Sequence, residues 1–272
     1  MYNVLIPVDR NETRAFHQAR YVSRLPNADE TVEATVLYVM PPDTFGDADD
    51  VEFAEVEAAV KAADHLEDAG VTVTRTVDDG GVAEQIARTA TELDADEIVV
   101  GGRKRSGVSR VLLGSTAQDV LLSADKPVTI TGENVVLGEG MRKVLVPVDT
   151  SVERARNQAE YLANLPGAPE SLEATVFFVF PHQDYKGAPP HEFEDVDAAV
   201  AAADYLDDEG IPVERVAIGG EVERKILDAA TERDVDSIVM GGRKRSGLTS
   251  VLLGSTTQDV MLSAERPVTL TG

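Results

Sequence analysis

The chain has 272 residues and a net charge of −24 at pH 7, because 49 Asp and Glu outnumber 25 Lys and Arg. A chain this acidic repels nucleic acid and anionic membrane surfaces, which argues against both as partners. The absence of Cys excludes disulfides and thiol chemistry, and no apolar run approaches the ~20 residues of a membrane-spanning helix.

Strand and helix patterns alternate from the start of the chain. Residues 2–8 form an apolar run that is typical of a strand buried on both faces. Asn11 is placed to cap a helix that extends to about Leu25. Residues 31–40 are rich in β-branched and aromatic side chains and predict a second strand, which an acidic loop over 41–50 follows.

The alternation continues to residue 130. Apolar residues at helical spacing from Val56 predict a helix that ends at Gly70. The segments predicted after it are a strand over 71–77, a helix after Gly80-Gly81, a strand over 97–100, a loop over 101–115, a helix from about Ser115 and a strand over 128–130. Strands that alternate with helices predict an α/β fold with a parallel sheet that is covered on both faces.

An internal repeat indicates the domain organisation. A displacement of 140 residues aligns the two halves without a gap, and 16 of the 20 residues over 101–120 are identical to their partners. Two copies of a long unit favour duplicated globular domains over a solenoid. We therefore predict domains over 1–132 and 141–272, joined by a linker over 133–140.

Each half carries a glycine-rich basic loop between a strand and a helix. The two loops read GGRKRSGVSRVLLGS at 101–115 and GGRKRSGLTSVLLGS at 241–255. Ligands of parallel sheets bind beyond the carboxyl ends of the strands, and the start of a helix attracts anions. Glycines, cations and hydroxyls at this place predict a phosphate site. The alternative is a plain turn whose cations pair with surface acids.

These residues carry a family resemblance. The runs VLIPVD at 4–9, LYV at 37–39, DEIVVG at 96–101 and LLGS at 112–115 resemble the universal stress protein family, and the resemblance covers nearly the whole chain as a tandem two-domain member. It implies two Rossmann-like domains of the adenine nucleotide alpha hydrolase-like type. Each is expected to have a five-stranded parallel sheet of order 3-2-1-4-5 and four helices. It also implies an internal pseudo-dimer through the fifth strands and leaves a homodimer open.

The resemblance implies an adenine nucleotide, which is ATP, ADP or AMP, with or without Mg²⁺. Members that bind ATP have Gly-x-x-Gly, nine residues, and then Gly-Ser or Gly-Thr. Here Lys104 and Lys244 stand at the second glycine, where a lysine either neutralises phosphate or blocks close backbone approach. The implied contacts are Pro7, Asp9, Val39, Gly101, Gly102, Arg103, Lys104, Gly114, Ser115 and Thr116 in the first half and Pro147, Asp149, Val179, Gly241, Gly242, Arg243, Lys244, Gly254, Ser255 and Thr256 in the second.

Roles within this set follow the family. Asp9 and Asp149 are expected at the ribose, Val39 and Val179 at the adenine, and the glycines and hydroxyls at the phosphates. For Asp9 the alternative is a loop carboxylate that caps the next helix.

The function expected from this site is regulatory. We expect a stress-response protein that binds an adenine nucleotide in one or both halves. The alternative is a scaffold without nucleotide whose basic loops dock a protein such as a transporter regulatory domain. No Walker A, HExxH or Ser-His-Asp order is present, which predicts no enzyme activity beyond slow, incidental ATP hydrolysis.

The surroundings of the protein are also predicted. The chain shows no signal-peptide pattern after Met1, so we expect a cytoplasmic protein. Its acidic clusters indicate adaptation to high salt and a halophilic archaeal origin, because salt screens repulsion between like charges.

Overall fold

A computed structural model describes residues 1–42, 51–104, 111–112, 114–132, 140–181, 191–244, 251–252 and 254–272, with the backbone alone for 103–104, 111–112, 243–244 and 251–252. The chain divides into two compact units, one built mainly from Met1–Val135 and the other mainly from Val136–Arg243 and Leu252–Gly272.

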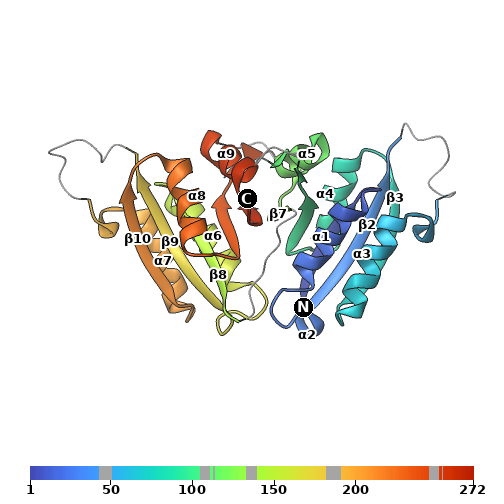
Figure 1. Ribbon diagram of the computed structural model, residues 1–272, viewed down its shortest axis with the longest axis horizontal. Helices are drawn as coiled ribbons and strands as arrows, with labels where there is room; N and C mark the ends of the chain where they lie inside the picture. The colour runs from blue at the N-terminus through green and yellow to red at the C-terminus, as the bar shows by residue number, and fades with distance from the viewer. Residues whose placement is uncertain are drawn as a thin grey trace. The chain divides into compact units, whose positions relative to one another are not determined.

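The first domain contains a five-stranded parallel sheet of order β3-β2-β1-β4-β7 (Figure 1). In terms of the five main strands this is the expected order 3-2-1-4-5, so the first and fourth strands are neighbours. The strands are β1 (Tyr2–Val8), β2 (Val32–Met40), β3 (Thr72–Asp79), β4 (Glu97–Gly101) and β7 (Val128–Thr131). Apolar runs occupy the central strands because helices cover both of their faces.

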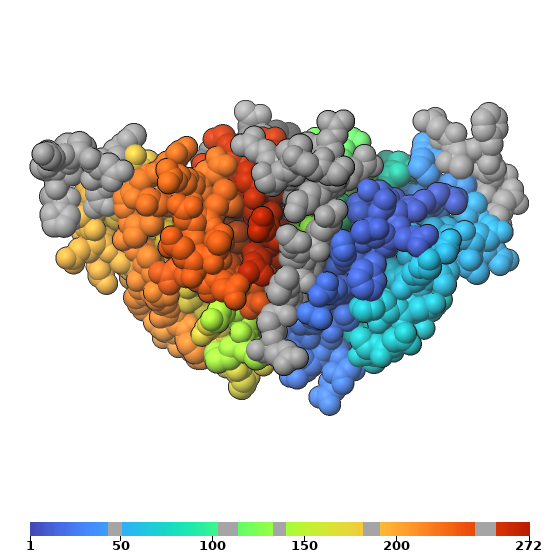
Figure 2. All heavy atoms as spheres, viewed as in Figure 1, coloured from blue at the N-terminus to red at the C-terminus, as the bar shows by residue number. Residues whose placement is uncertain are grey.

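Four long helices cover this sheet. On one face α1 (Glu12–Val22) packs beside α3 (Glu57–Asp68), and on the other α4 (Val82–Glu92) packs beside α5 (Ser115–Ser123) (Figure 1). Figure 2 shows the face of α1 and α3, in blue and cyan, as a continuous packed surface. Leu5, Ile6, Leu37, Leu66 and Ile98 are completely buried between the helices and the sheet.

The second domain repeats this architecture. Its parallel sheet has the order β10-β9-β8-β11-β14. The strands are β8 (Arg142–Pro147), β9 (Leu172–Phe180), β10 (Val213–Gly219), β11 (Ser237–Gly241) and β14 (Val268–Thr271), and the helices are α6 (Val152–Ala163), α7 (Asp197–Asp208), α8 (Val222–Glu232) and α9 (Ser255–Ser263). The two-domain α/β fold predicted from the sequence is therefore confirmed.

Short elements depart from the predictions. Helix α1 ends at Val22, not at Leu25, and α2 (Ala28–Thr31) occupies the place where the second strand was expected to begin. Asn27 takes a left-handed conformation with φ 52°, which turns the chain. After this turn the Thr31 hydroxyl donates a hydrogen bond to the Asn27 carbonyl oxygen. The 3₁₀ turns η2 (Phe53–Glu55) and η3 (Phe193–Asp195) were also not predicted.

The basic loops contain strands that the sequence did not predict. In the first domain β5 (Arg103–Lys104) pairs antiparallel with β6 (Val111–Leu112), and in the second β12 (Arg243–Lys244) pairs with β13 (Val251–Leu252). The loop tips, the side chains of the paired cations, the acidic loop at 43–50 and the linker at 133–139 lie outside the described residues. The pseudo-dimer stays a prediction.

A buried carboxylate lies at the amino-terminal ends of β1 and β4. Glu97 is fully buried, and it accepts hydrogen bonds from the hydroxyls of Tyr2 (3.0 Å) and Tyr21 (3.1 Å). The second domain has Ser237 in place of Glu97 and Arg142 in place of Tyr2, and the Arg142 guanidinium donates to the Ser237 hydroxyl at 3.4 Å. The two domains therefore differ in the polar part of their cores.

None of the helices in the part of the chain that the structure describes is long and apolar enough to cross a membrane.

Candidate functional site

The sheet of the first domain opens between β1 and β4 at the carboxyl ends of these strands. The two strands pair no further than Leu5 and Ile98, and Pro7 has no N–H group with which to continue the ladder. Gln18 of α1 bridges the opening, because its Nε2 donates to the carbonyl oxygens of Pro7 and Val99, both at 2.7 Å. A side-chain amide thus satisfies two carbonyls that the diverging strands leave without a backbone donor.

The second domain has the same bridge at the same place. Gln158 of α6 donates to the carbonyl oxygens of Pro147 (2.9 Å) and Val239 (2.8 Å). Gln18 and Gln158 are only 2% and 1% exposed. The bridge is therefore part of the duplicated core, and it marks the switch point at which ligands of this class of sheet bind.

A cavity lies at each opening. Its volume is about 440 Å³ in the first domain and about 330 Å³ in the second, which is the size range of small-molecule sites. The first is lined by the predicted residues Pro7, Asp9, Val39, Gly101, Gly114 and Thr116, and the second by Pro147, Asp149, Val179, Gly241, Gly254, Ser255 and Thr256. The structure thus brings together side chains from the ends of three strands and from the start of a helix.

The cavity linings do not include three of the predicted contacts, which are Gly102, Gly242 and Ser115. The N–H groups of Gly102 and Gly242 donate to the carbonyls of Thr131 (2.7 Å) and Thr271 (2.6 Å), so they extend the sheet. Ser115 is exposed at the start of α5 and is absent from the first cavity's lining, although Ser255 lines the second. The side chains of Arg103, Lys104, Arg243 and Lys244 lie outside the described residues.

The carboxylate at the end of β1 has two partners in each domain. Asp9 accepts the N–H of Asn11 at 2.8 Å and forms an ion pair with Arg14. Asp149 forms the equivalent ion pair with Arg154, whose Nε lies 2.9 Å from it. Neither arginine was predicted at the site, although an Asp followed by an Arg five residues later stands at the same place in both halves. Each ion pair presents a neutral, polar group to the cavity.

The helix cap at this place is not the carboxylate itself. Asn11 caps α1, because its side chain accepts the N–H of Arg14 at 2.9 Å. Asp9 instead orders the turn before the cap. Half of its side chain is still exposed, with a relative accessibility of 49%, so a ligand can reach the carboxylate.

The start of α5 differs from the start of α1 in one important respect. The residue at its cap is Gly114, which has no side chain to accept the first N–H groups, and α9 begins in the same way after Gly254. Gly114 and Thr116 line the first cavity, and Gly254 and Thr256 line the second. Two helices therefore present first-turn donors without a side-chain acceptor at a cavity, together with the positive end of the helix dipole.

Gly101 lines the cavity, and it also packs closely against α1. A Cβ atom at this position would lie 3.0 Å from Cβ of Arg14 and 3.2 Å from Oε1 of Gln18. At Gly241 the nearest atom, Cβ of Arg154, would lie at 3.1 Å. A side chain at either glycine would therefore have to push back the helix that carries the arginine and the glutamine by a few tenths of an ångström.

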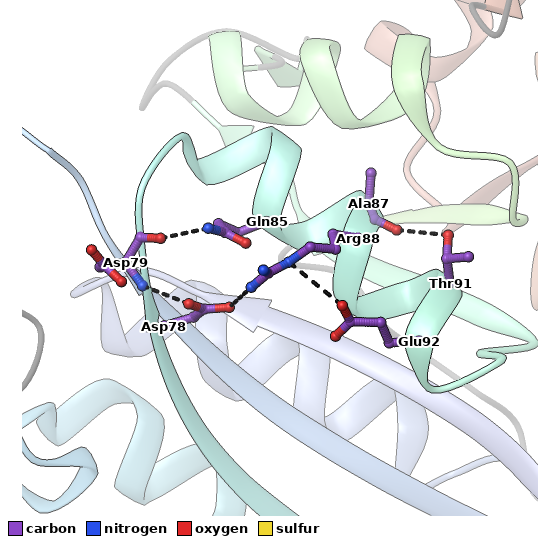
Figure 3. A network of polar contacts seen from close by, with 7 residues as sticks. All are labelled: Asp78, Asp79, Gln85, Ala87, Arg88, Thr91 and Glu92. Carbon is purple, nitrogen blue, oxygen red and sulfur yellow. Dashed lines mark hydrogen bonds and ion pairs between the residues drawn. The ribbon is translucent and has the colours of Figure 1, made fainter.

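Helix α4 supplies an apolar wall. Val82 lines the first cavity, and polar contacts fix the turn just before it (Figure 3). Gln85 donates to the carbonyl of Asp79 at 2.6 Å, and Arg88 forms an ion pair with Asp78 at 2.7 Å. These contacts connect the helix to the end of β3, so the wall has a defined position.

The cavity is therefore amphipathic. Its lining includes apolar side chains, which are Val39, Val82 and Ile86, and it also includes the ion pair and the start of α5, which offer charge and N–H donors. Among the described residues, no three Asp, Glu or His side chains are grouped so as to hold a metal ion. The arrangement suits a ligand with a flat apolar part and an anionic part.

Comparisons with known proteins identify the family of the chain. The profile of the universal stress protein family matches residues 1–132 and 140–272. A universal stress protein of Mycolicibacterium smegmatis is 30% identical over 201 residues, which are 68% of this chain and 65% of that protein. The chain spans 61–65% of the length of the curated relatives that it matches first.

A solved structure shares the fold over nearly the whole chain. A universal stress protein from Archaeoglobus fulgidus superposes with a TM-score of 0.74 at 23% identity, over 99% of this chain and 98% of that one. A universal stress protein from the same organism, in complex with dAMP, gives a TM-score of 0.39 at 24% identity over 48% of this chain and 98% of that one. The family profile covers both domains, and the chain belongs to the universal stress protein family.

Proposed function

We propose that each domain binds an adenine nucleotide in its cavity and that nucleotide occupancy regulates a response to stress. The observation that carries this proposal is that one cavity is lined both by apolar side chains such as Val39 and by the uncapped start of α5. A purine suits the first surface and a phosphate the second. Asp9, with its half-exposed carboxylate, is the acceptor available to ribose hydroxyls.

The proposal does not include a dedicated enzymatic activity. Among the described residues, no histidine lines either cavity, and the one carboxylate of each is held in an ion pair. In this proposal the carboxylate accepts from the ribose hydroxyls, so no other described group of the lining is left to act as a general base toward water, and ATP hydrolysis would be slow and incidental. With a single carboxylate at the site, Mg²⁺ would be held mainly by the phosphates that it accompanies.

A substitution at the helix cap tests the anion site without removing any contact of the core. Gly114 has φ −67° and ψ 159°, an extended conformation that any residue adopts. In Gly114→Asp the new carboxylate accepts the first-turn N–H groups of α5 and repels phosphate, while it stabilises the helix by a few tenths of a kcal/mol relative to glycine. We expect an unchanged or slightly higher melting temperature and at least a tenfold loss of ATP affinity at this cavity.

Calorimetry with ATP, ADP and AMP measures this loss. The matched variant Gly254→Asp tests the second domain, and the double variant should lose at least tenfold in ATP affinity at both cavities. If the double variant binds ATP as tightly as the wild type, the starts of α5 and α9 are not the phosphate site. If the wild type itself gives no heat, nucleotide binding is refuted, and docking of a protein through the basic loops becomes the function to test, with Arg103→Ala and Lys104→Ala.

A further inference from the structure

The two cavities differ in charge. The first is lined by two guanidinium groups, Arg10 and Arg14, and by the carboxylate of Asp9. The second is lined by the pair Asp149–Arg154, with Thr150 at the position of Arg10. Among the described lining residues, the first cavity thus has one positive charge more than the second.

The additional cation is held at the cavity by an aromatic ring. The Nε of Arg10 donates to the hydroxyl of Tyr38 at 3.0 Å, and its guanidinium carbon lies 5.4 Å from the centre of that ring. Arg14 has a carboxylate partner, whereas among the described residues no carboxylate oxygen lies within 4.0 Å of the Arg10 guanidinium. In a chain with 49 acidic residues, a cation at the lining of a cavity that has no acidic partner within the described part of the chain is a candidate to bind an anion from outside.

The second domain lacks every part of this arrangement. Phe178, at the position of Tyr38, has no hydroxyl, and its ring packs edge-on against Phe180 at 4.8 Å between centres. The second cavity is also smaller, about 330 Å³ against about 440 Å³. Two larger side chains, Phe177 and Met240, line it at the positions of leucine and valine in the first domain.

We propose that the two domains bind nucleotides unequally, because Arg10 makes the first cavity selective for the more highly phosphorylated nucleotide. This inference rests on the proposed function and adds to it a difference in nucleotide selectivity between the two domains. The first domain distinguishes ATP from AMP by charge, since a guanidinium strengthens its contacts with each added negative group. The second domain, which has no additional cation among its described lining residues, responds to both nucleotides with similar affinity.

Affinities measured separately in each domain test this proposal. In one titration of the full chain, amide NMR signals of Thr116 report the first cavity, and those of Thr256 report the second. We expect Arg10→Thr to weaken ATP binding at the first cavity about tenfold, to weaken AMP binding less, and to leave adenosine binding unchanged. The reciprocal variant Thr150→Arg should tighten ATP binding at the second cavity, by a smaller factor because Phe178 offers no hydroxyl to hold the new side chain.

We expect both Arg10→Thr and Thr150→Arg to preserve the fold. Arg10 is exposed, and threonine and arginine each stand at this position in one of the two domains. The loss caused by Arg10→Thr should shrink as KCl is raised, because salt screens exposed charges.

The possible results separate the two proposals. If ATP binds both cavities equally and Arg10→Thr changes neither affinity, nucleotide binding stands and the inequality is overturned. An equal loss of adenosine binding in Arg10→Thr would also overturn it, because the arginine would then contact the nucleoside. If neither amide moves at millimolar ATP, both proposals fail.

Discussion

The bridge between β1 and β4 leads to a quantitative prediction for Gln18→Leu. Leucine has nearly the volume of glutamine, so the substitution removes the amide donor and leaves little empty space. The carbonyls of Pro7 and Val99, each 2.7 Å from Nε2, then lose this partner inside the protein. A buried polar group without a partner costs about 1–3 kcal/mol, and the new apolar contacts offset part of this.

We therefore expect Gln18→Leu to lower the free energy of unfolding of the first domain by about 2–4 kcal/mol. For a domain of this size, each kcal/mol lost from the free energy of unfolding lowers the melting temperature by roughly 3–4 °C. The unfolding of two domains need not be a single transition. Hydrogen exchange in a urea series, read by mass spectrometry on peptides of β1 and β4, gives the opening free energy of the first domain alone.

Two variants serve as controls for this measurement. Gln158→Leu should produce the same loss in the second domain, because the duplicated bridge has nearly the same distances. Gln118→Leu changes an exposed glutamine of α5 and should cost less than about 0.5 kcal/mol. If Gln18→Leu and Gln118→Leu have equal stability, the amide bridge does not stabilise the opening, and the reasoning is refuted.

Three other predictions concern packing, pH and salt. Gly101→Ala should cost about 1–3 kcal/mol, because its methyl group would lie 3.0 Å from Cβ of Arg14 and push α1 away from β4; an unchanged urea midpoint would contradict this. Burial lowers the pKa of His65 below that of an exposed histidine. The unfolded chain therefore binds more protons as the pH falls below about 6.5, and the stability of the first domain should fall in that range, a slope that His65→Gln should reduce. The net charge of −24 should make the urea midpoint rise toward molar KCl, and a midpoint that KCl does not change would show that repulsion is not limiting.

The elements that sequence reasoning predicted well are those with a local cause. The apolar run over residues 2–8 coincides with β1, and Asn11 caps α1 as expected. The strand order, by contrast, followed from the family resemblance, because the periodicity of a strand does not specify its neighbour. Asn27 shows a limit of prediction from local sequence, since its left-handed conformation starts a helical turn just before a segment of strand-like composition.

Contacts between distant residues account for most of what was missed at the site. Gln18 reads as one polar residue of a helix, and its role appears only when Val99, 81 residues later, lies beside it. The carboxylate of Glu97 lies in a strand of apolar character, and its hydroxyl partners come from the start of β1, from α1 and, with Thr129, from β7. Tyr38 reads as a core residue, and the structure adds that its hydroxyl holds a cation at the cavity.

The absence of histidine among the described lining residues of both cavities has a consequence for signalling. Histidine is the side chain whose ordinary pKa makes it change charge near neutrality. The described lining residues therefore include no side chain whose ordinary pKa lies near neutrality, whereas the terminal phosphate of a nucleotide has its second pKa close to this range. Under the proposed function, a change in nucleotide affinity between pH 6.5 and pH 7.5 would therefore come from the charge of the ligand and not from the described lining residues.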